Sequence, residues 1–162
     1  ALRIQRLRQY GWDKNRVTEE VGMNSRLDEL QAAILNIKLK HLDEDNMSRR
    51  EIANEYNTQL AGLELVLPAE YSETQHVYHQ YVVSCKHRDK IKNQLAEKEI
   101  SAGIHYAVPG HLYGGYAQKC VLPNDGLPVT ERIVQKILSL PIYPEMTLDQ
   151  VRQVANTLSQ LL

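Results

Sequence analysis

The chain has 162 residues, 43% of them hydrophobic and 24% charged, which is the usual size and composition of one globular domain with a buried core. Its 19 basic and 20 acidic side chains give a net charge of −1, so no overall field draws it to nucleic acid or to an anionic membrane. Since it has two cysteines and no apolar run long enough to span a bilayer, we expect reduced thiols, no membrane partner, no nucleic-acid partner and a cytoplasmic location.

An amphipathic pattern in the first half of the chain predicts a long helix. Leucine and isoleucine recur at three- and four-residue spacing over residues 27–37, and the pattern resumes over residues 52–63, with Gly62 as a C-terminal cap. A continuous helix over about residues 26–61 would be roughly 50 Å long at about 1.5 Å per residue, longer than a domain of this size is wide. Such a helix requires support from outside this chain or a break near the acidic residues 43–45.

The rest of the chain predicts strands and shorter helices. Segment 76–85 is rich in valine and tyrosine and apolar on both faces, which favours a central strand with Cys85 buried in it. Thr147 and Gln150 form a capping box at the start of the last helix. In chain order we expect a strand at 76–85, a helix at 89–99, a strand at 100–106, a loop at 109–127, a helix at 130–138, an extended piece at 139–143 and a helix at 147–161.

This order of elements indicates the fold class. Few strands separated by helices, beside one dominant helix, are typical of a small sheet covered by helices. We therefore predict an α+β fold rather than a doubly wound sheet, with residues 1–162 as a single domain.

The segment GMNSRLDELQAA has the pattern of a helix start. Ser25 is the expected N-cap, Asp28 follows three residues later, and Asn24 lies just outside the helix. The pattern has two interpretations. Either these residues only cap the helix, or its free backbone N–H groups and the Asn24 amide bind an anion such as phosphate.

Four motifs cover nearly the whole chain, from about Leu7 onward. They are GMNSRLDELQAAIL with its continuations KLKHLDE and RREIANEYN, then HVYHQYVV, then GIHYAVPGHL with the later Tyr116 and Ala117, then LSLPIYPEMTLDQV. In this order they resemble the DegT/DnrJ/StrS family of sugar-nucleotide aminotransferases. The resemblance implies the small C-terminal domain of a fold-type I aminotransferase that uses pyridoxal phosphate.

The resemblance also implies what this chain does not contain. In that family a large domain carries the Schiff-base lysine, an aspartate for the pyridine nitrogen and most of the phosphate cradle. It would precede Ala1, with residues 1–23 as the residual linker to it. We therefore expect no catalytic residue and no bound pyridoxal phosphate in this chain alone.

By the same resemblance, Asn24 is a cofactor-binding residue. It matches an asparagine that reaches across a dimer interface to the cofactor phosphate of the neighbouring subunit. This implies a homo-oligomer, most simply a dimer, and agrees with the anion-binding interpretation of the helix start.

Four further residues are candidates for substrate binding. His105 and Tyr106 match a pair that lies against the sugar of a nucleotide-linked substrate, although the pattern alone also fits a surface histidine and a packed tyrosine. Lys14 and Arg16 flank Asn15, which occupies the position where the family often has a basic residue for the diphosphate. Solvated surface charges are the alternative for these two residues.

A metal site is not expected. His76 and His79 are three residues apart in a predicted strand, so their rings would point to opposite faces and not chelate one ion. His111 matches a position in the same loop as His105 to which the resemblance assigns no role. The sequence also has no serine or cysteine nucleophile in a recognisable setting and no glycine-rich phosphate loop.

Two functions are consistent with these observations. The first is part of an aminotransferase that moves an amino group, most simply from glutamate, onto a nucleotide-linked keto sugar. Within the family, HYAVPGH is most similar to members that act on deoxythymidine-diphosphate keto sugars at C3. The second is a stand-alone, non-catalytic module for binding or oligomerisation, derived from that domain. A reading frame that extends upstream through a cofactor-binding domain would support the first, and one that starts at Ala1 the second.

Overall fold

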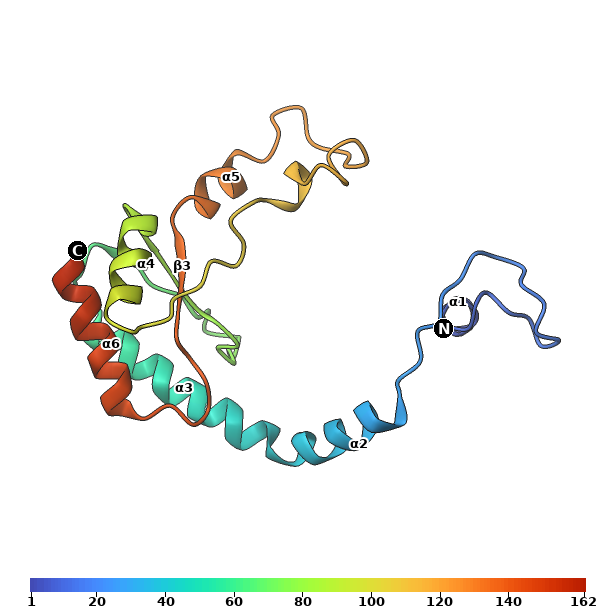
Figure 1. Cartoon of the computed structure of the whole chain (residues 1–162), viewed down its shortest axis with the longest axis horizontal. Helices are drawn as coiled ribbons and strands as arrows, with labels where there is room; N and C mark the ends of the chain where they lie inside the picture. The colour runs from blue at the N-terminus through green and yellow to red at the C-terminus, as the bar shows by residue number, and fades with distance from the viewer. The chain divides into compact units, whose positions relative to one another are not determined.

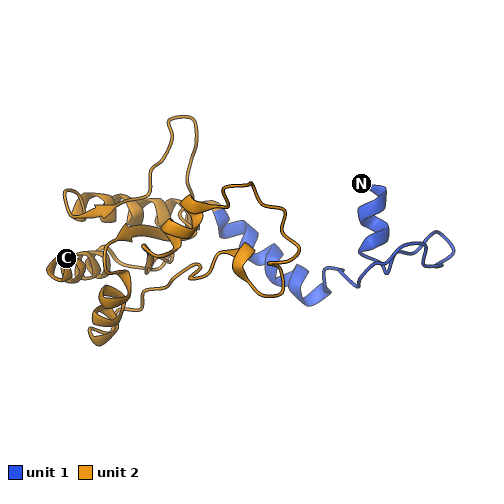
Figure 2. Cartoon of the chain, turned by 90° about the horizontal axis from the view of Figure 1, so that it is seen from above, with its two compact units in different colours: residues 1–42 blue, residues 43–162 orange.

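The structure is a computed structural model that describes residues 1–162. The chain divides into two compact units, residues 1–42 and residues 43–162 (Figure 2). None of its helices is both long enough and apolar enough to cross a membrane.

The first unit begins with a short helix followed by a folded loop. Helix α1 (Leu2–Leu7) is followed by a loop that closes through backbone bridges between Gln9 and Asn24 and between Trp12 and Thr18. Gly11 is required inside this loop, because it has a φ of +72° and a Cβ there would overlap the carbonyl oxygen of Glu20.

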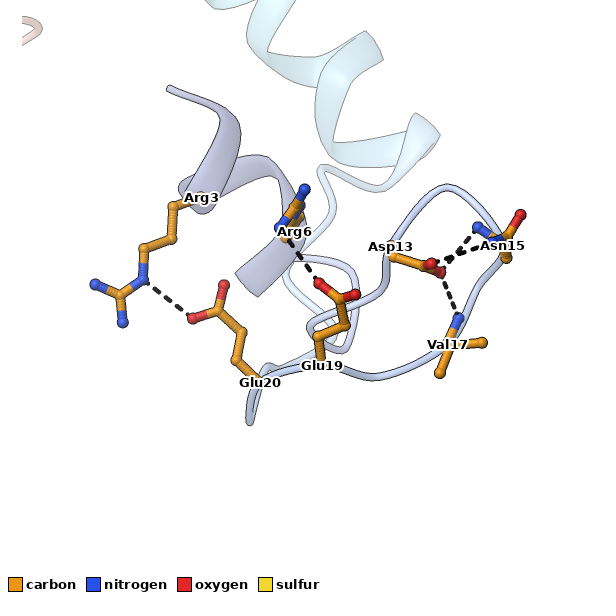
Figure 3. A network of polar contacts seen from close by, with 7 residues as sticks. All are labelled: Arg3, Arg6, Asp13, Asn15, Val17, Glu19 and Glu20. Carbon is orange, nitrogen blue, oxygen red and sulfur yellow. Dashed lines mark hydrogen bonds and ion pairs between the residues drawn. The ribbon is translucent and has the colours of Figure 1, made fainter.

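Polar contacts hold the loop against α1. Arg3 and Arg6 form ion pairs with Glu20 and Glu19, at 3.0 and 3.5 Å (Figure 3). At the loop tip, the carboxylate of Asp13 accepts hydrogen bonds from two backbone N–H groups, those at positions 15 and 17, both at 2.8 Å (Figure 3). This is an Asx-type turn, in which a side chain replaces the missing backbone partners.

Helix α2 (Glu29–Lys38) begins later than the sequence pattern predicts. Its N-cap residue is Asp28, not Ser25, and no side chain caps it. The backbone N–H of Ser25 instead donates to the carbonyl of Arg8, so this residue belongs to the base of the loop. The expected capping arrangement of Ser25 with Asp28 is therefore wrong, because pairing within the loop takes precedence over early helix formation.

A 3-10 segment, η1 (Leu39–His41), lies between α2 and α3 (Leu42–Gln59) in the sequence. Lys38 and Leu42 on either side keep right-handed helical dihedral angles. The helical pattern therefore changes just before the acidic residues 43–45. These residues occupy the first turn of α3, where negative charge is favoured by the helix dipole.

The second unit is built on a three-stranded antiparallel sheet (Figure 1). The strand order is β1 (Leu65–Val66), β2 (Tyr81–Cys85), β3 (Ile137–Leu140). The remaining elements are α4 (Arg88–Glu97), η2 (Gly110–Leu112), α5 (Pro128–Val134) and α6 (Leu148–Leu161). A small sheet with helices confirms the predicted α+β class.

The core lies between one face of the sheet and helices α3, α4 and α6 (Figure 1). Alternate residues of β2, namely Tyr81, Val83 and Cys85, are buried on this face, as the period of two requires. Cys85 is thus buried in a strand, as predicted, and burial raises the pKa of its thiol. Helix α6 starts with the predicted capping box of Thr147 and Gln150.

Segment 76–80 is not part of the predicted strand. Arg50 donates to the carbonyl of His76 at 2.7 Å and also to the carboxylate of Glu70 at 2.8 Å. Tyr78 is buried with a positive φ of 48°, and its backbone N–H donates to Nδ1 of His76. These contacts use polar groups that a strand would pair in a ladder, so β2 begins only at Tyr81.

Two other boundaries also differ from the prediction. Segment 100–106 forms no strand, because only Gly103 pairs with β3, at Ser139. The helix expected at 130–138 ends at Val134, and Ile137–Leu140 is a strand. The buried Arg88 donates hydrogen bonds to the carbonyls of Val134 and Ile137. The first of these is a carbonyl at the end of α5 that has no partner within the helix, and the second is at the start of β3.

Candidate functional site

His105 is held on the edge of the sheet. Its Nδ1 lies 2.9 Å from Oγ of Ser139, in the middle of β3. The backbones of Gly103 and Ser139 exchange two hydrogen bonds, 2.9 and 2.8 Å long, directly before His105 in the chain. The bridge fixes the backbone, and the side-chain contact then fixes the ring.

Gly103 lies against the imidazole itself. A Cβ at this position would be 2.6 Å from Cε1 of His105, closer than real side chains approach. Its φ is not positive, so the glycine is needed for the space that the ring occupies and not for an unusual backbone.

Tyr106 follows directly and is 67% exposed. Its ring is edge-on to that of His105, with centroids 5.7 Å apart. Both residues precede the turn-rich segment from Val108 to Leu127 that contains η2. The structure therefore brings the two predicted sugar-binding residues together on one surface, with the phenol ring open to solvent.

His111, in η2, is the second histidine of this region. It is only 8% exposed, and its Nε2 lies 3.0 Å from Oε1 of Glu131 in α5. This contact brings the two ends of segment 112–130 close together. His111 thus has a structural partner, which the sequence did not assign.

Lys14, Arg16 and Asn24 belong to the first unit. Lys14 and Arg16 are exposed on either side of Asn15 at the tip of the loop, and Arg16 has a positive φ of 63°. Asn24 is exposed at the base of the same loop, where its backbone bridges to Gln9, four residues before the N-cap of α2. Its expected place directly beside a helix N-terminus is therefore not found.

Comparison with known proteins identifies the family. Residues 1–159 match the sequence profile of the DegT/DnrJ/EryC1/StrS aminotransferase family. The chain belongs to this family. This confirms the resemblance found in the sequence motifs.

Individual aminotransferases of the family are similar over nearly the whole chain. A dTDP-3-amino-3,6-dideoxy-alpha-D-galactopyranose transaminase of Aneurinibacillus thermoaerophilus is 39% identical over 160 residues, which are 99% of this chain and 43% of the relative. A dTDP-3-amino-3,4,6-trideoxy-alpha-D-glucose transaminase of Streptomyces venezuelae is 38% identical over 161 residues, 99% of this chain and 42% of that protein. The crystal structure of DesV from S. venezuelae, in complex with a ketimine intermediate, superposes with a TM-score of 0.88 at 38% identity, covering 99% of this chain and 43% of DesV.

The chain thus spans less than half the length of these aminotransferases, and the matched part is their C-terminal part. The complete enzymes of the family depend on pyridoxal phosphate. A Schiff-base lysine must lose its proton near neutral pH, which requires burial or a neighbouring positive charge.

The lysines of this aminotransferase chain do not fit that requirement. None of the nine is buried: eight are exposed, and Lys92 is half-buried on α4. None of the nine lysines therefore has the buried setting of a Schiff-base lysine. No group of three or more His, Cys, Asp or Glu side chains is arranged to hold a metal ion either.

Sequence reasoning missed Ser139, Gly103 and Glu131. A serine between Leu138 and Leu140 in an apolar segment is a weak signal that something must pair its hydroxyl. Gly103, two residues before the His-Tyr pair, is a second signal, because glycine in an extended segment often marks a close approach. Glu131 carries no sequence signal, since its contact with His111 arises from the folding of segment 112–130.

Proposed function

We propose that this chain is the C-terminal part of a pyridoxal-phosphate-dependent aminotransferase that transfers an amino group from glutamate to a nucleotide-linked keto sugar. The observation that carries the proposal is the pairing of His105 with Ser139 beside the exposed ring of Tyr106. This ordered polar surface lies in a chain whose relatives at 38–39% identity are named as dTDP-amino-sugar transaminases. Amination at C3 of a deoxythymidine-diphosphate keto sugar follows from those names.

The chemistry of the side chains suggests a role for each in the complete enzyme. The imidazole of His105 and the phenol of Tyr106 offer hydrogen bonds and a flat apolar ring to a sugar. Lys14 and Arg16, exposed and without side-chain partners, suit the negative diphosphate. The Asn24 amide would donate one hydrogen bond to the cofactor phosphate of the neighbouring subunit.

A dimer is part of this proposal. Helix α2 has no buried residue, although it carries four large aliphatic side chains over residues 30–37. An apolar surface of this kind is usually covered by a partner. Because Cys85 and Cys120 are both free thiols, we propose the cytoplasm as the compartment.

We further propose that this chain alone forms no internal aldimine and has no transaminase activity. One hydrogen bond from Asn24 to a phosphate contributes about 1 kcal/mol net, or up to about 3 with a charged acceptor, which is too little to retain the cofactor. The test is to mix the chain with pyridoxal phosphate, reduce with borohydride and map labelled lysines by mass spectrometry. Stoichiometric labelling of one lysine, with turnover of a keto sugar and glutamate, would show that the chain is a complete small enzyme.

Substrate binding is tested by titrating the chain with a deoxythymidine-diphosphate sugar and following amide signals by NMR. The expected result is weak binding, with a Kd near or above millimolar, which corresponds to about −4 kcal/mol. The shifts should centre on His105 and Tyr106. Shifts confined to other regions would rule out the assignment. If the sugar binds at His105 and Tyr106 but the chain gains no activity when a cofactor domain is supplied, the non-catalytic module is favoured.

A further inference from the structure

We infer that Ser139 and Gly103 are positioning residues of the sugar site, which hold His105 so that its Nε2 is presented to the nucleotide-linked sugar. This inference rests on the proposed function, because it assigns the role of His105 within that site. It adds two residues whose contacts are with His105 and not with the ligand.

The first observation is the setting of Ser139. Cross-strand pairing places Ser139 opposite Val82, on the sheet face that points away from the core helices α3, α4 and α6, whereas Leu138 and Leu140 point into the core. The serine is nevertheless only 6% exposed, and its hydroxyl makes its side-chain hydrogen bond to Nδ1 of His105. A buried hydroxyl requires a partner, and the imidazole is that partner.

The second observation is the space at Gly103. An added Cβ would be 2.6, 3.3 and 3.4 Å from Cε1, Nδ1 and Nε2 of His105, so the ring lies along the glycine backbone. The same glycine is bridged to Ser139 by two backbone hydrogen bonds. The imidazole is therefore held by two residues that are joined to each other: Ser139 through a hydrogen bond, and Gly103 through packing against its backbone.

The consequence concerns the other ring nitrogen. With Nδ1 engaged, Nε2 remains available to a ligand. A hydroxyl both donates and accepts, so Ser139 can pair with Nδ1 in either neutral tautomer, and Nε2 can offer a lone pair or a proton. By contrast, the carboxylate of Glu131 can only accept from His111 when ionised. An adaptable nitrogen suits a sugar, whose hydroxyl groups also donate and accept.

The holding of His105 by Ser139 and Gly103 is tested first in the chain without ligand. Histidine labelled with ¹⁵N reports the state of both ring nitrogens by long-range NMR, and a His105→Ala variant assigns the signals. We expect Ser139→Ala to shift the Nδ1 and Nε2 signals of His105, and Ser139→Thr, which keeps the hydroxyl, to restore them. Gly103→Ala should also shift them, because its methyl group displaces the ring.

Ser84→Ala is the matched control, since Ser84 lies on the same sheet, is half-buried and pairs with Ile137. It should leave the His105 signals in place. Unchanged His105 signals in both Ser139→Ala and Gly103→Ala would overturn the inference, as would an equal shift in Ser84→Ala.

The second test adds a deoxythymidine-diphosphate sugar and compares dissociation constants in a double-mutant cycle. We expect Ser139→Ala to weaken binding about fivefold in the wild-type background and to have no further effect in His105→Ala. Equal weakening in both backgrounds would show that Ser139 acts independently of His105 and would overturn the inference. If the sugar does not bind the wild-type chain at all, the assignment of a sugar site to His105 and Tyr106 in this chain fails, whereas the ligand-free spectra still decide whether Ser139 and Gly103 hold His105.

Discussion

The rings of Tyr56 and Tyr81 stack in the core with their centroids 4.8 Å apart, and each hydroxyl has its own acceptor. Tyr56 on α3 donates to the carbonyl of Pro141 at 2.9 Å, and Tyr81 on β2 donates to Oδ1 of Asn57 at 2.6 Å. Because neither ring is exposed, these hydroxyl groups depend on protein partners. The stack therefore joins α3 both to β2 and to the segment that follows β3.

Replacing Tyr56 with phenylalanine should destabilise the chain. The ring remains, but the carbonyl of Pro141 loses its donor in a partly buried setting, which costs about 1–2 kcal/mol. Urea unfolding followed by circular dichroism measures the loss. Tyr71→Phe is the matched control, because Tyr71 is exposed and should change the free energy of unfolding by less than about 0.5 kcal/mol. Equal stability of the two variants would contradict the role of the buried hydroxyl.

Stability should fall in alkaline solution. Burial raises the pKa of both Tyr56 and Tyr81 above the ordinary value of about 10. Below pH 10 both are neutral in the folded and the unfolded chain, so they add no pH dependence. Above pH 10 only the unfolded chain releases these protons, and the free energy of unfolding decreases as the pH rises. Unfolding midpoints should stay level up to about pH 10 and decline above it, and the decline should be shallower in Tyr56→Phe/Tyr81→Phe.

The capping box of α6 should contribute measurably to stability. Thr147→Ala removes the hydroxyl that accepts from the backbone N–H of Gln150, and the expected cost is about 1 kcal/mol. Thr157→Ala is a control in the same helix, since its hydroxyl only bonds back to the carbonyl of Gln153. Alanine is the better helix former there, so thermal unfolding should show no loss. An equal loss of thermal stability in both variants would show that the capping box is not its cause.

Self-association should depend on α2. Leu30 is 74% exposed and Ile37 is 62% exposed, so Leu30→Glu/Ile37→Glu should shift the chain towards monomer in light scattering. Gln31→Glu introduces a charge on the same helix without removing apolar surface and should leave the mass unchanged. A strictly monomeric wild-type chain at high concentration would contradict the proposed dimer.

Local patterns predicted the elements whose boundaries depend on local contacts. Helices α4 and α6 and the cap at Thr147 follow from amphipathic spacing and capping residues, and the buried Cys85 follows from a valine-rich strand. Segment 76–80 was mispredicted because its conformation depends on Arg50, which lies 26 positions before His76 and binds both its carbonyl and the carboxylate of Glu70. Such contacts have no periodicity that a sequence could reveal.

In the candidate site, too, local motifs were predictable and distant contacts were not. The motif around His105 and Tyr106 could be recognised from the sequence, but its support could not. Ser139 lies 34 positions later in the chain and becomes a partner only when Gly103 pairs with β3. The start of α2 was likewise misplaced, since the backbone pairing of Ser25 with Arg8 depends on how the preceding loop closes.

The chain pairs with β3 at Gly103 and enters β3 itself at Ile137, and a second closure, between His111 and Glu131, lies inside this loop. Residues 112–130 can therefore change in length or composition without altering the register of β3, because the His111–Glu131 contact and the Gly103–Ser139 bridge lie between them and the sheet. Lengthening a loop is also inexpensive, at about 0.6 kcal/mol for each doubling. This nesting allows residues 112–130 to vary in length and sequence while the pairing of Gly103 with β3 stays the same.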